Sequence, residues 1–260
     1  MGMEGRLVQV FRNVLHTDLE SFDGRFTAYV KQRFAKQLLA MRGDSVHVDP
    51  SMPVPALVKL ANERPGDFRL QLLVGSALIR RNATDAAIPV IERARTLFPE
   101  FPADQGPYPW LAKAYEAKHD LAKAAAVLRD IVDNDEAAYA TRLELADVLE
   151  QSGDLKGAEQ ALQGAIYVNP FEVAVHEHLA RLAEQVNDHE TNVRERRAVL
   201  ALNPVDLAGA LYQLALAQYR AGDDVAARRS VIRALEQAPN YAEAQELLLT
   251  IVDAAGGKTS

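Results

Sequence analysis

Small and apolar residues recur at helical spacing through most of the chain and predict a series of amphipathic helices. The pattern is clearest in residues 153–170, where Ala158, Leu162 and Ala165 fall on one face of a helix. Asn169-Pro170 should end that helix, because proline cannot continue it. The same apolar pattern occurs 34 residues earlier, and the Asn-Pro stop recurs 34 residues later. The chain is therefore predicted to contain a repeated unit of two helices.

The period of 34 residues divides most of the chain into five repeats, with a short insertion at residues 101–109. The predicted repeats are 68–101, 105–138, 139–172, 173–206 and 208–241. A half repeat at 53–66 opens the array, which spans 53–254, and a capping helix at 241–253 closes it. That last helix is expected to pack through Ala242, Leu247, Leu248 and Ile251. A disordered tail is expected at 255–260.

Four features recur at fixed places in the repeats and give the period a physical basis. Small residues at the eighth and twentieth positions let helices approach closely, and a larger residue at the seventh position fills the remaining volume. The small residues are Gly75, Ala112, Ala146, Ala180 and Ala215, then Ala87, Ala124, Ala158, Asn192 and Ala227; the fillers are Val74, Leu111, Leu145, Leu179 and Leu214. Residue types that tolerate positive φ are expected at the turns: Asn82, His119, Gly153, Asn187 and Gly222. The aspartates that follow, Asp120, Asp154, Asp188 and Asp223, are expected to cap the second helices.

A separate helical segment is predicted at residues 1–42, before a polar linker at 43–52. Its main helix, at about 18–41, should begin at a capping box formed by Thr17 and Glu20. One face of this helix is broadly apolar, through Leu19, Phe22, Phe26, Val30, Phe34 and Leu38. So wide an apolar face is expected to be buried against another part of the protein or against a partner. Self-association through the face around Phe22, Phe26, Tyr29 and Phe34 is one alternative function.

Residues 68–254 resemble tetratricopeptide repeats (TPRs), through the period of 34 and the recurrent small residues. The resemblance implies an all-α fold, a right-handed superhelix (α-solenoid) of about five helix pairs with an N-terminal helical segment and a C-terminal capping helix. It also implies that the first helices line a concave face that binds a protein or peptide. The function expected is therefore that of a non-catalytic interaction scaffold.

A second resemblance concerns residues 10–35, VFRNVLHTDLESFDGRFTAYVKQRFA. This run is similar to the closing helices of bacterial gluzincin-type (peptidase MA-like) metallopeptidases, in some of which TPRs follow the catalytic domain. The zinc-binding HExxH motif of that family does not occur in this sequence. The alternative that follows is a regulatory or substrate-holding region of a zinc metallopeptidase whose catalytic domain is absent from this chain.

The composition restricts the kinds of partner that the protein is expected to bind. A net charge of −7 argues against nucleic acid, which requires a basic face. No apolar run approaches the ~18 residues of a membrane-spanning helix, so membrane insertion is not expected. The first residues lead directly into an amphipathic pattern, so no signal peptide is expected in this chain. The compartment stays open between cytoplasm and, if a leader was removed, periplasm.

The sequence offers no clear catalytic or metal-binding group. His176 and His178 are two residues apart, so on a helix they point in different directions and should not bind one ion. They are interpreted as a surface or groove pair. Phosphate-binding glycine motifs are absent, apart from Gly256-Gly257-Lys258-Thr259 in the expected tail. No enzyme activity, cofactor or metal is therefore predicted.

The predicted peptide-binding groove is acidic in the middle and aromatic in the last repeat. Such a surface suits a peptide with basic groups and an apolar anchor. The asparagines with which some TPRs clamp a terminal carboxylate are not present, and Trp110 is interpreted as core or turn packing. The residues expected to line the groove are Arg80, Lys113, Glu116, Asp147, Glu150, Glu177, Arg181, Glu184, Tyr212, Leu216, Tyr219 and Arg220.

Arg196 departs from the repeat pattern, since Leu128 and Leu162 hold the same position in two earlier repeats. A cation at an apolar position must reach solvent or meet a carboxylate. We therefore expect that Arg196 either loosens the packing of the fourth repeat or forms an ion pair there.

Overall fold

The structure is a computed structural model that describes residues 9–40, 48–49, 51–99, 101 and 106–257. Within these residues all regular secondary structure is helical, which confirms the all-α prediction. The chain forms two compact units, residues 1–118 and 119–260. The division falls between the two helices of the predicted repeat 105–138. Most of the linker predicted at 43–52 lies outside the described residues.

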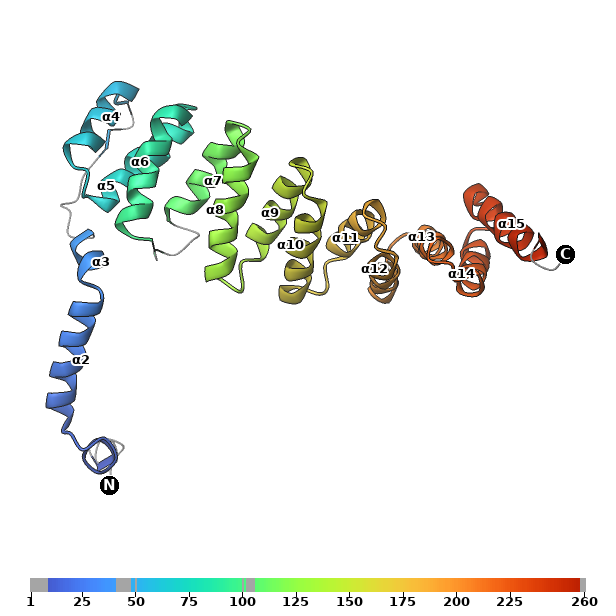
Figure 1. The fold of residues 1–260 in the computed structure, drawn as a ribbon, viewed down its shortest axis with the longest axis horizontal. Helices are drawn as coiled ribbons and strands as arrows, with labels where there is room; N and C mark the ends of the chain where they lie inside the picture. Colours follow the sequence, from blue (N-terminus) through green and yellow to red (C-terminus); the bar gives the residue numbers. More distant parts are fainter. Residues whose placement is uncertain (1–8, 41–47, 50, 100, 102–105, 258–260) are drawn as a thin grey trace. The chain divides into compact units, whose positions relative to one another are not determined.

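In the first unit, α4 to α7 pack against one another in chain order, and α3 contacts α6 (Figure 1). No residue of α2 is buried, so its apolar face is uncovered within the described part of the chain. The helices of this unit are α2 (Leu19–Arg33), α3 (Ala35–Ala40), α4 (Val54–Glu63), α5 (Phe68–Arg80), α6 (Thr84–Leu97) and α7 (Pro107–Ala117).

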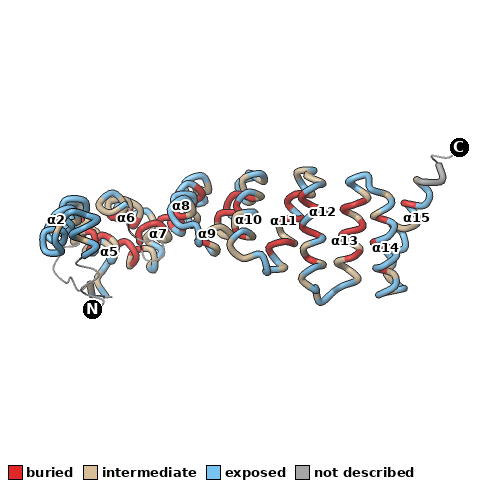
Figure 2. The backbone as a smooth tube through the Cα atoms, turned by 90° about the horizontal axis from the view of Figure 1, so that it is seen from below, coloured by how far each residue is buried: buried red, intermediate tan, exposed pale blue. Residues whose placement is uncertain are grey.

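In the second unit each helix packs on the next, and the closest pairs are α9 with α10, α11 with α12, and α13 with α14. Buried residues alternate with exposed ones along each of these helices (Figure 2). The helices are α8 (Leu121–Asn134), α9 (Tyr139–Gln151), α10 (Leu155–Val168), α11 (Val173–Gln185), α12 (His189–Ala201), α13 (Leu207–Arg220), α14 (Asp224–Gln237) and α15 (Ala242–Gly257).

Every small residue predicted at the eighth and twentieth positions is buried, and so is every filler at the seventh. Ala158 is 0% exposed and Leu162 is 1% exposed. At Gly75 a Cβ atom would lie 2.3 Å from Ile91 Cγ1, so the Ile91 side chain of α6 occupies the place that a side chain on α5 would need. Small residues therefore mark the close contacts between helices.

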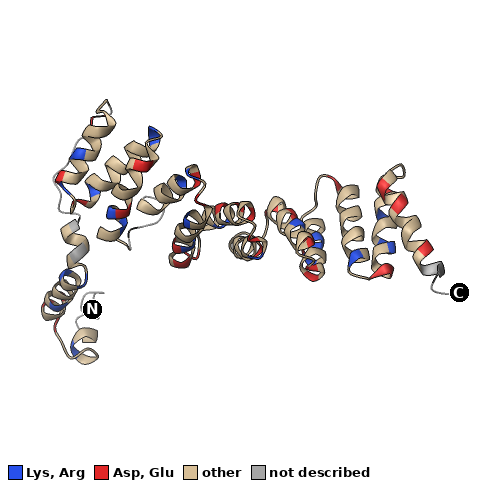
Figure 3. Ribbon diagram, turned by 45° about the horizontal axis from the view of Figure 1, so that its top comes forward, with Lys and Arg blue, Asp and Glu red and all other residues tan. Residues whose placement is uncertain are grey.

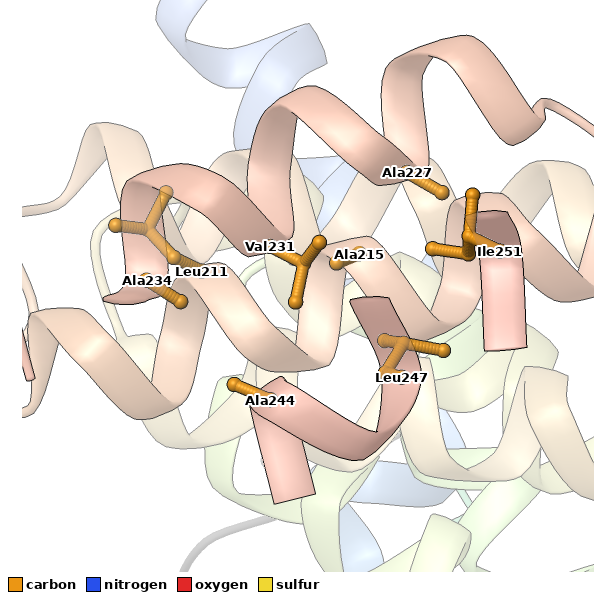
Figure 4. Packing of buried hydrophobic residues seen from close by; sticks show 8 residues of the cluster. All are labelled: Leu211, Ala215, Ala227, Val231, Ala234, Ala244, Leu247 and Ile251. Atoms are coloured by element: carbon orange, nitrogen blue, oxygen red, sulfur yellow. The ribbon is translucent and has the colours of Figure 1, made fainter. Parts of the chain in front are cut away.

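The last helix closes the second unit through an apolar cluster with α13 and α14 (Figure 4). The prediction of its packing face was wrong at Ala242, which is exposed, because Ala244 takes the buried place. The helix also ends at Gly257 rather than at 253, so residues 255–257 of the expected tail are helical, and residues 258–260 lie outside the described part. The buried members of the cluster are Leu211, Ala215, Ala227, Val231, Ala234, Ala244, Leu247 and Ile251.

The turn and cap predictions are confirmed. All five turn residues have φ between 56° and 83°, the left-handed region that glycine and asparagine tolerate best. Each predicted aspartate accepts a hydrogen bond from the backbone N–H three residues later. These bonds satisfy donors that the first turn of a helix leaves free, and so fix where each second helix begins.

The predicted start of the N-terminal helix was wrong. Asp18, rather than Thr17, is the N-cap, and its Oδ1 accepts from Ser21 N at 2.8 Å. The hydrogen bonds also lower the pKa of the Asp18 carboxyl, because they favour its charged form. The single helix expected at 18–41 is divided at Phe34 into α2 and α3.

Candidate functional site

The twelve residues predicted to line a groove are exposed or half-buried, and none of them belongs to the core. Arg80, Lys113 and Glu116 lie in the first unit, on α5 and α7. The other nine lie on the first helices of the second unit, α9, α11 and α13. Together with His178, these nine are called the first-helix face: Asp147, Glu150, Glu177, Arg181, Glu184, Tyr212, Leu216, Tyr219 and Arg220.

A hydrogen bond joins α9 to α11 on this face. His178 Nε2 lies 2.7 Å from Glu150 Oε2, and the two side chains are 21% and 37% exposed. Residues Glu150 and His178 come from successive repeats, so the face continues from one repeat to the next. The sequence interpretation placed His178 on a surface or in a groove, and its side chain is half-buried; it was not among the predicted site residues.

An ion pair joins α11 to α13 in the same way, between Glu184 and Arg220. Both side chains are more than a third exposed, so water screens the pair and the bond adds little to stability. These two contacts also use part of the negative charge that the sequence places in the middle of the groove. Figure 3 accordingly shows both signs of charge on the helices of the second unit.

One cluster on the face has metal-ligand chemistry. Among the described residues, the ligand atoms of Asp147, Glu150 and His178 lie within 4.8 Å of one another. A histidine nitrogen with two carboxylate oxygens is a donor set that suits zinc and similar divalent ions. The hydrogen bond between Glu150 and His178 gives these two side chains a partner without an ion. The absence of a metal thus stays a prediction.

The aromatic end of the face contains a pair of tyrosines. The rings of Tyr212 on α13 and Tyr241 are 5.1 Å apart, centroid to centroid. Burial raises the pKa of the Tyr241 hydroxyl, and the nearby carboxylate of Glu243 raises it further. Tyr212, Leu216 and Tyr219 are each half-buried, so they keep apolar surface available beside the core.

In the first unit, Trp110 lies beneath two of the predicted site residues. The guanidinium of Arg80 is 5.3 Å from its ring centroid, and the Lys113 ammonium is 5.5 Å away. Both distances fall within the range of cation–π attraction. Trp110 is half-buried, so its ring supports the two cations rather than serving only the core. The spacing of Trp110 and Lys113, three residues on one helix, was the signal available in the sequence.

His176 was wrongly predicted as a surface or groove histidine. It is 5% exposed, and its Nδ1 lies 2.6 Å from Glu195 Oε2, while its Nε2 lies 3.0 Å from the carbonyl oxygen of Pro170. Glu195 is also buried, and its other oxygen accepts a hydrogen bond from Arg194 Nε at 2.7 Å. These contacts join α11 to α12 and the preceding turn, so His176 has a structural role.

The fold is defined by helix pairs of similar length, by turn residues with left-handed φ and by small residues where helices touch. The solved structure of YrrB, a TPR protein with an unusual peptide-binding site, is 16% identical with a TM-score of 0.50, and the match covers 75% of this chain and 98% of YrrB. The likeness shows that the chain has the tetratricopeptide-repeat fold.

Two further solved structures are similar to the chain. A chain of the Naa15/Naa10 complex bound to HypK-THB is 15% identical with a TM-score of 0.54, and the match covers 73% of this chain and 29% of that one. MamA is 18% identical with a TM-score of 0.49, over 70% of this chain and 96% of MamA. No protein-family model matches the chain, and no curated protein matches it in sequence. The resemblance of residues 10–35 to metallopeptidases stays a prediction.

Within the described residues, no helix has the length and apolar character needed to cross a membrane.

Proposed function

We propose that the chain is a protein-interaction scaffold that binds a peptide or protein segment on the first-helix face of the second unit. The observation that carries the proposal is the continuity of that face. Its residues come from three successive first helices, they lie outside the core, and two polar contacts link them across the repeats. A surface of this kind is formed before the ligand arrives, so binding requires little ordering of the receptor.

The chemistry of the face favours a ligand with both basic and apolar groups. Asp147 and Glu177 make no ion pair with the described residues, so their carboxylates can meet a basic ligand. Tyr212, Leu216 and Tyr219 offer half-buried apolar surface for an anchor. YrrB has a peptide-binding site by its description, and this supports the same use of a fold shared with it.

The test is binding of labelled peptides that alternate lysine with leucine or tyrosine, measured by fluorescence anisotropy on the whole chain. The variant Glu150→Lys with Glu184→Lys should weaken binding about tenfold or more, because it places like charges against the ligand. Glu236→Lys, an exposed charge reversal on the second helix α14, is the matched control and should change binding little. Equal binding by the parent protein and the double variant would contradict the proposal.

Self-association through α2 is a second candidate, and the uncovered apolar side chains of that helix favour it. Phe26 is 53% exposed and Tyr29 is 59% exposed, while Phe22 stacks on Phe26 with ring centroids 6.1 Å apart. Exposed aromatic clusters commonly mark contact surfaces. Light scattering over a concentration series should show an increase in mass that Phe26→Ser with Tyr29→Ser removes. A constant monomer mass in the parent protein would eliminate this candidate.

A further inference from the structure

The second unit contains a cavity of about 490 Å³ between α11, α12 and the N-terminal part of α13. Part of its boundary is open to solvent. Apolar side chains form much of its wall, among them Val173, Val199 and Val205. Three charged residues also line it: Glu177 of the first-helix face, Arg196 of α12, and Asp206, whose Oδ1 accepts a hydrogen bond from the backbone N–H of Gly209.

The cavity occurs where the fourth repeat departs from the others. Leu128 and Leu162 hold the position of Arg196 in two earlier repeats, and they are 0% and 1% exposed. In the fifth repeat the equivalent residue is Val231, which is 0% exposed. A compact apolar side chain therefore fills this position in the other three repeats compared. In the fourth repeat the long, charged side chain of Arg196 takes its place, next to the cavity.

Arg196 is buried without a partner. It is only 9% exposed, and among the described residues it makes no hydrogen bond or ion pair. Burial lowers the pKa of its guanidinium, and the carboxylate of Glu177 opposes that shift without forming an ion pair. A guanidinium carries five N–H donors, and those of Arg196 lie beside the solvent-open cavity rather than sealed from water. The arrangement thus holds a donor group ready for an acceptor that enters the cavity.

We propose that this cavity is a binding site for a carboxylate whose carrier also presents an apolar side chain and an amide N–H. Arg196 would bind the carboxylate with two parallel hydrogen bonds, the geometry that guanidinium and carboxylate groups share. Glu177 would accept the amide N–H, and the valines would contact the apolar side chain. A peptide supplies all three groups, through its terminal carboxylate or through an acidic side chain. The site does not depend on the proposed function, because a small carboxylate can occupy it alone.

Isothermal titration calorimetry on the whole chain tests the site with three small probes. N-acetyl-leucine carries a main-chain carboxylate, N-acetyl-glutamic acid α-amide carries a side-chain carboxylate, and N-acetyl-leucinamide carries none. Binding of one or both carboxylates, without binding of the amide, is expected, and the tighter carboxylate identifies the source. Failure of both carboxylates to bind, or equal binding by the leucinamide, would overturn the proposal.

Three variants assign the binding to Arg196. Arg196→Leu should weaken binding of the carboxylate by about tenfold or more, because a charged hydrogen bond is lost. Arg197→Leu removes the same charge from an exposed position next in sequence, and it should leave binding within about twofold. Glu177→Gln should tighten binding, since it removes a like charge while keeping an acceptor for the amide. Equal weakening by the two arginine variants would show general charge attraction and refute the site.

The arginine variant should remain folded, because leucine is the residue that earlier repeats use at this position. Its stability should equal or exceed that of the parent protein, as expected when a buried cation without a partner is removed. Circular dichroism melts of Arg196→Leu check this, so that lost binding cannot be confused with lost structure.

Discussion

Single residues determine how closely the helices pack, and Ala158 and Leu162 on α10 illustrate the two opposite demands. Ala158 lies where a larger side chain has no room, and Leu162 fills a space that a smaller one would leave empty. Interiors are packed as densely as organic crystals, so a change of volume in either direction is felt.

Substitutions at these two positions should therefore both destabilise the protein. Leu162→Ala should lower the free energy of unfolding by about 2–5 kcal/mol through a cavity. Ala158→Leu should lower it by about 1–3 kcal/mol through overpacking. Urea unfolding followed by circular dichroism measures both changes. Ala126→Leu, at an exposed position of α8, is the control and should change the value by less than about 0.5 kcal/mol.

The cap of α12 should contribute to stability in a way that depends on pH. The backbone N–H of Thr191 donates to Asp188 Oδ1 at 3.0 Å and lowers the pKa of that carboxyl from its ordinary value of 3.8. A depressed pKa in the folded protein stabilises it well above pH 3.8, and this contribution is lost as the pH falls through the folded value.

Asp188→Ala should accordingly lower the free energy of unfolding by about 1 kcal/mol at pH 7. The difference from the parent protein should shrink as the pH is lowered below 3.8. Urea titrations at several pH values measure it, and Glu190→Ala in the same turn is the control. A difference that grows on acidification would show that the cap acts in another way.

At the scale of the helix pair, the sequence predicted the turns and caps correctly but not the side-chain contacts between helices. The caps and left-handed turns depend on residues close in sequence, so Asp154 and Gly153 could be predicted from local rules. Contacts between successive first helices, such as Glu150 with His178, depend on how two repeats approach each other. The burial of His176 was missed because its partner Glu195 lies on the other helix of the same repeat, so the contact depends on how α11 and α12 pack.

The contact between α11 and α13 should be weak, which leaves both side chains accessible to a ligand. A double-mutant cycle of Glu184→Gln and Arg220→Gln should give a coupling free energy of about 0.2–1 kcal/mol at low salt. The coupling should nearly vanish at 1 M salt, since the Debye length falls to about 3 Å there. A coupling of several kcal/mol at high salt would show that the pair is shielded from water.

Within each unit, contacts are made mainly between helices that are neighbours in sequence, as in repeat proteins generally. From α4 to α7, and again from α8 to α15, each helix packs on the next one in its unit. Loss of stability in one place should thus affect its neighbours more than distant helices.

Leu211→Ala tests this locality, because Leu211 is 1% exposed and belongs to the cluster that closes the second unit. The substitution should cost about 2–5 kcal/mol and accelerate amide hydrogen exchange in α13, α14 and α15. Exchange in α5 and α6, which belong to the first unit, should change little. Uniform acceleration along the chain would show instead that the molecule opens as one cooperative body.

The left-handed residue and aspartate cap inside each helix pair recur in the pairs α9/α10, α11/α12 and α13/α14. A second copy of residues 139–172, inserted after residue 172, would thus begin and end at connections between repeats that already occur in the chain. The protein can therefore be lengthened by genetic duplication in whole repeats, and each copy adds one more helix pair.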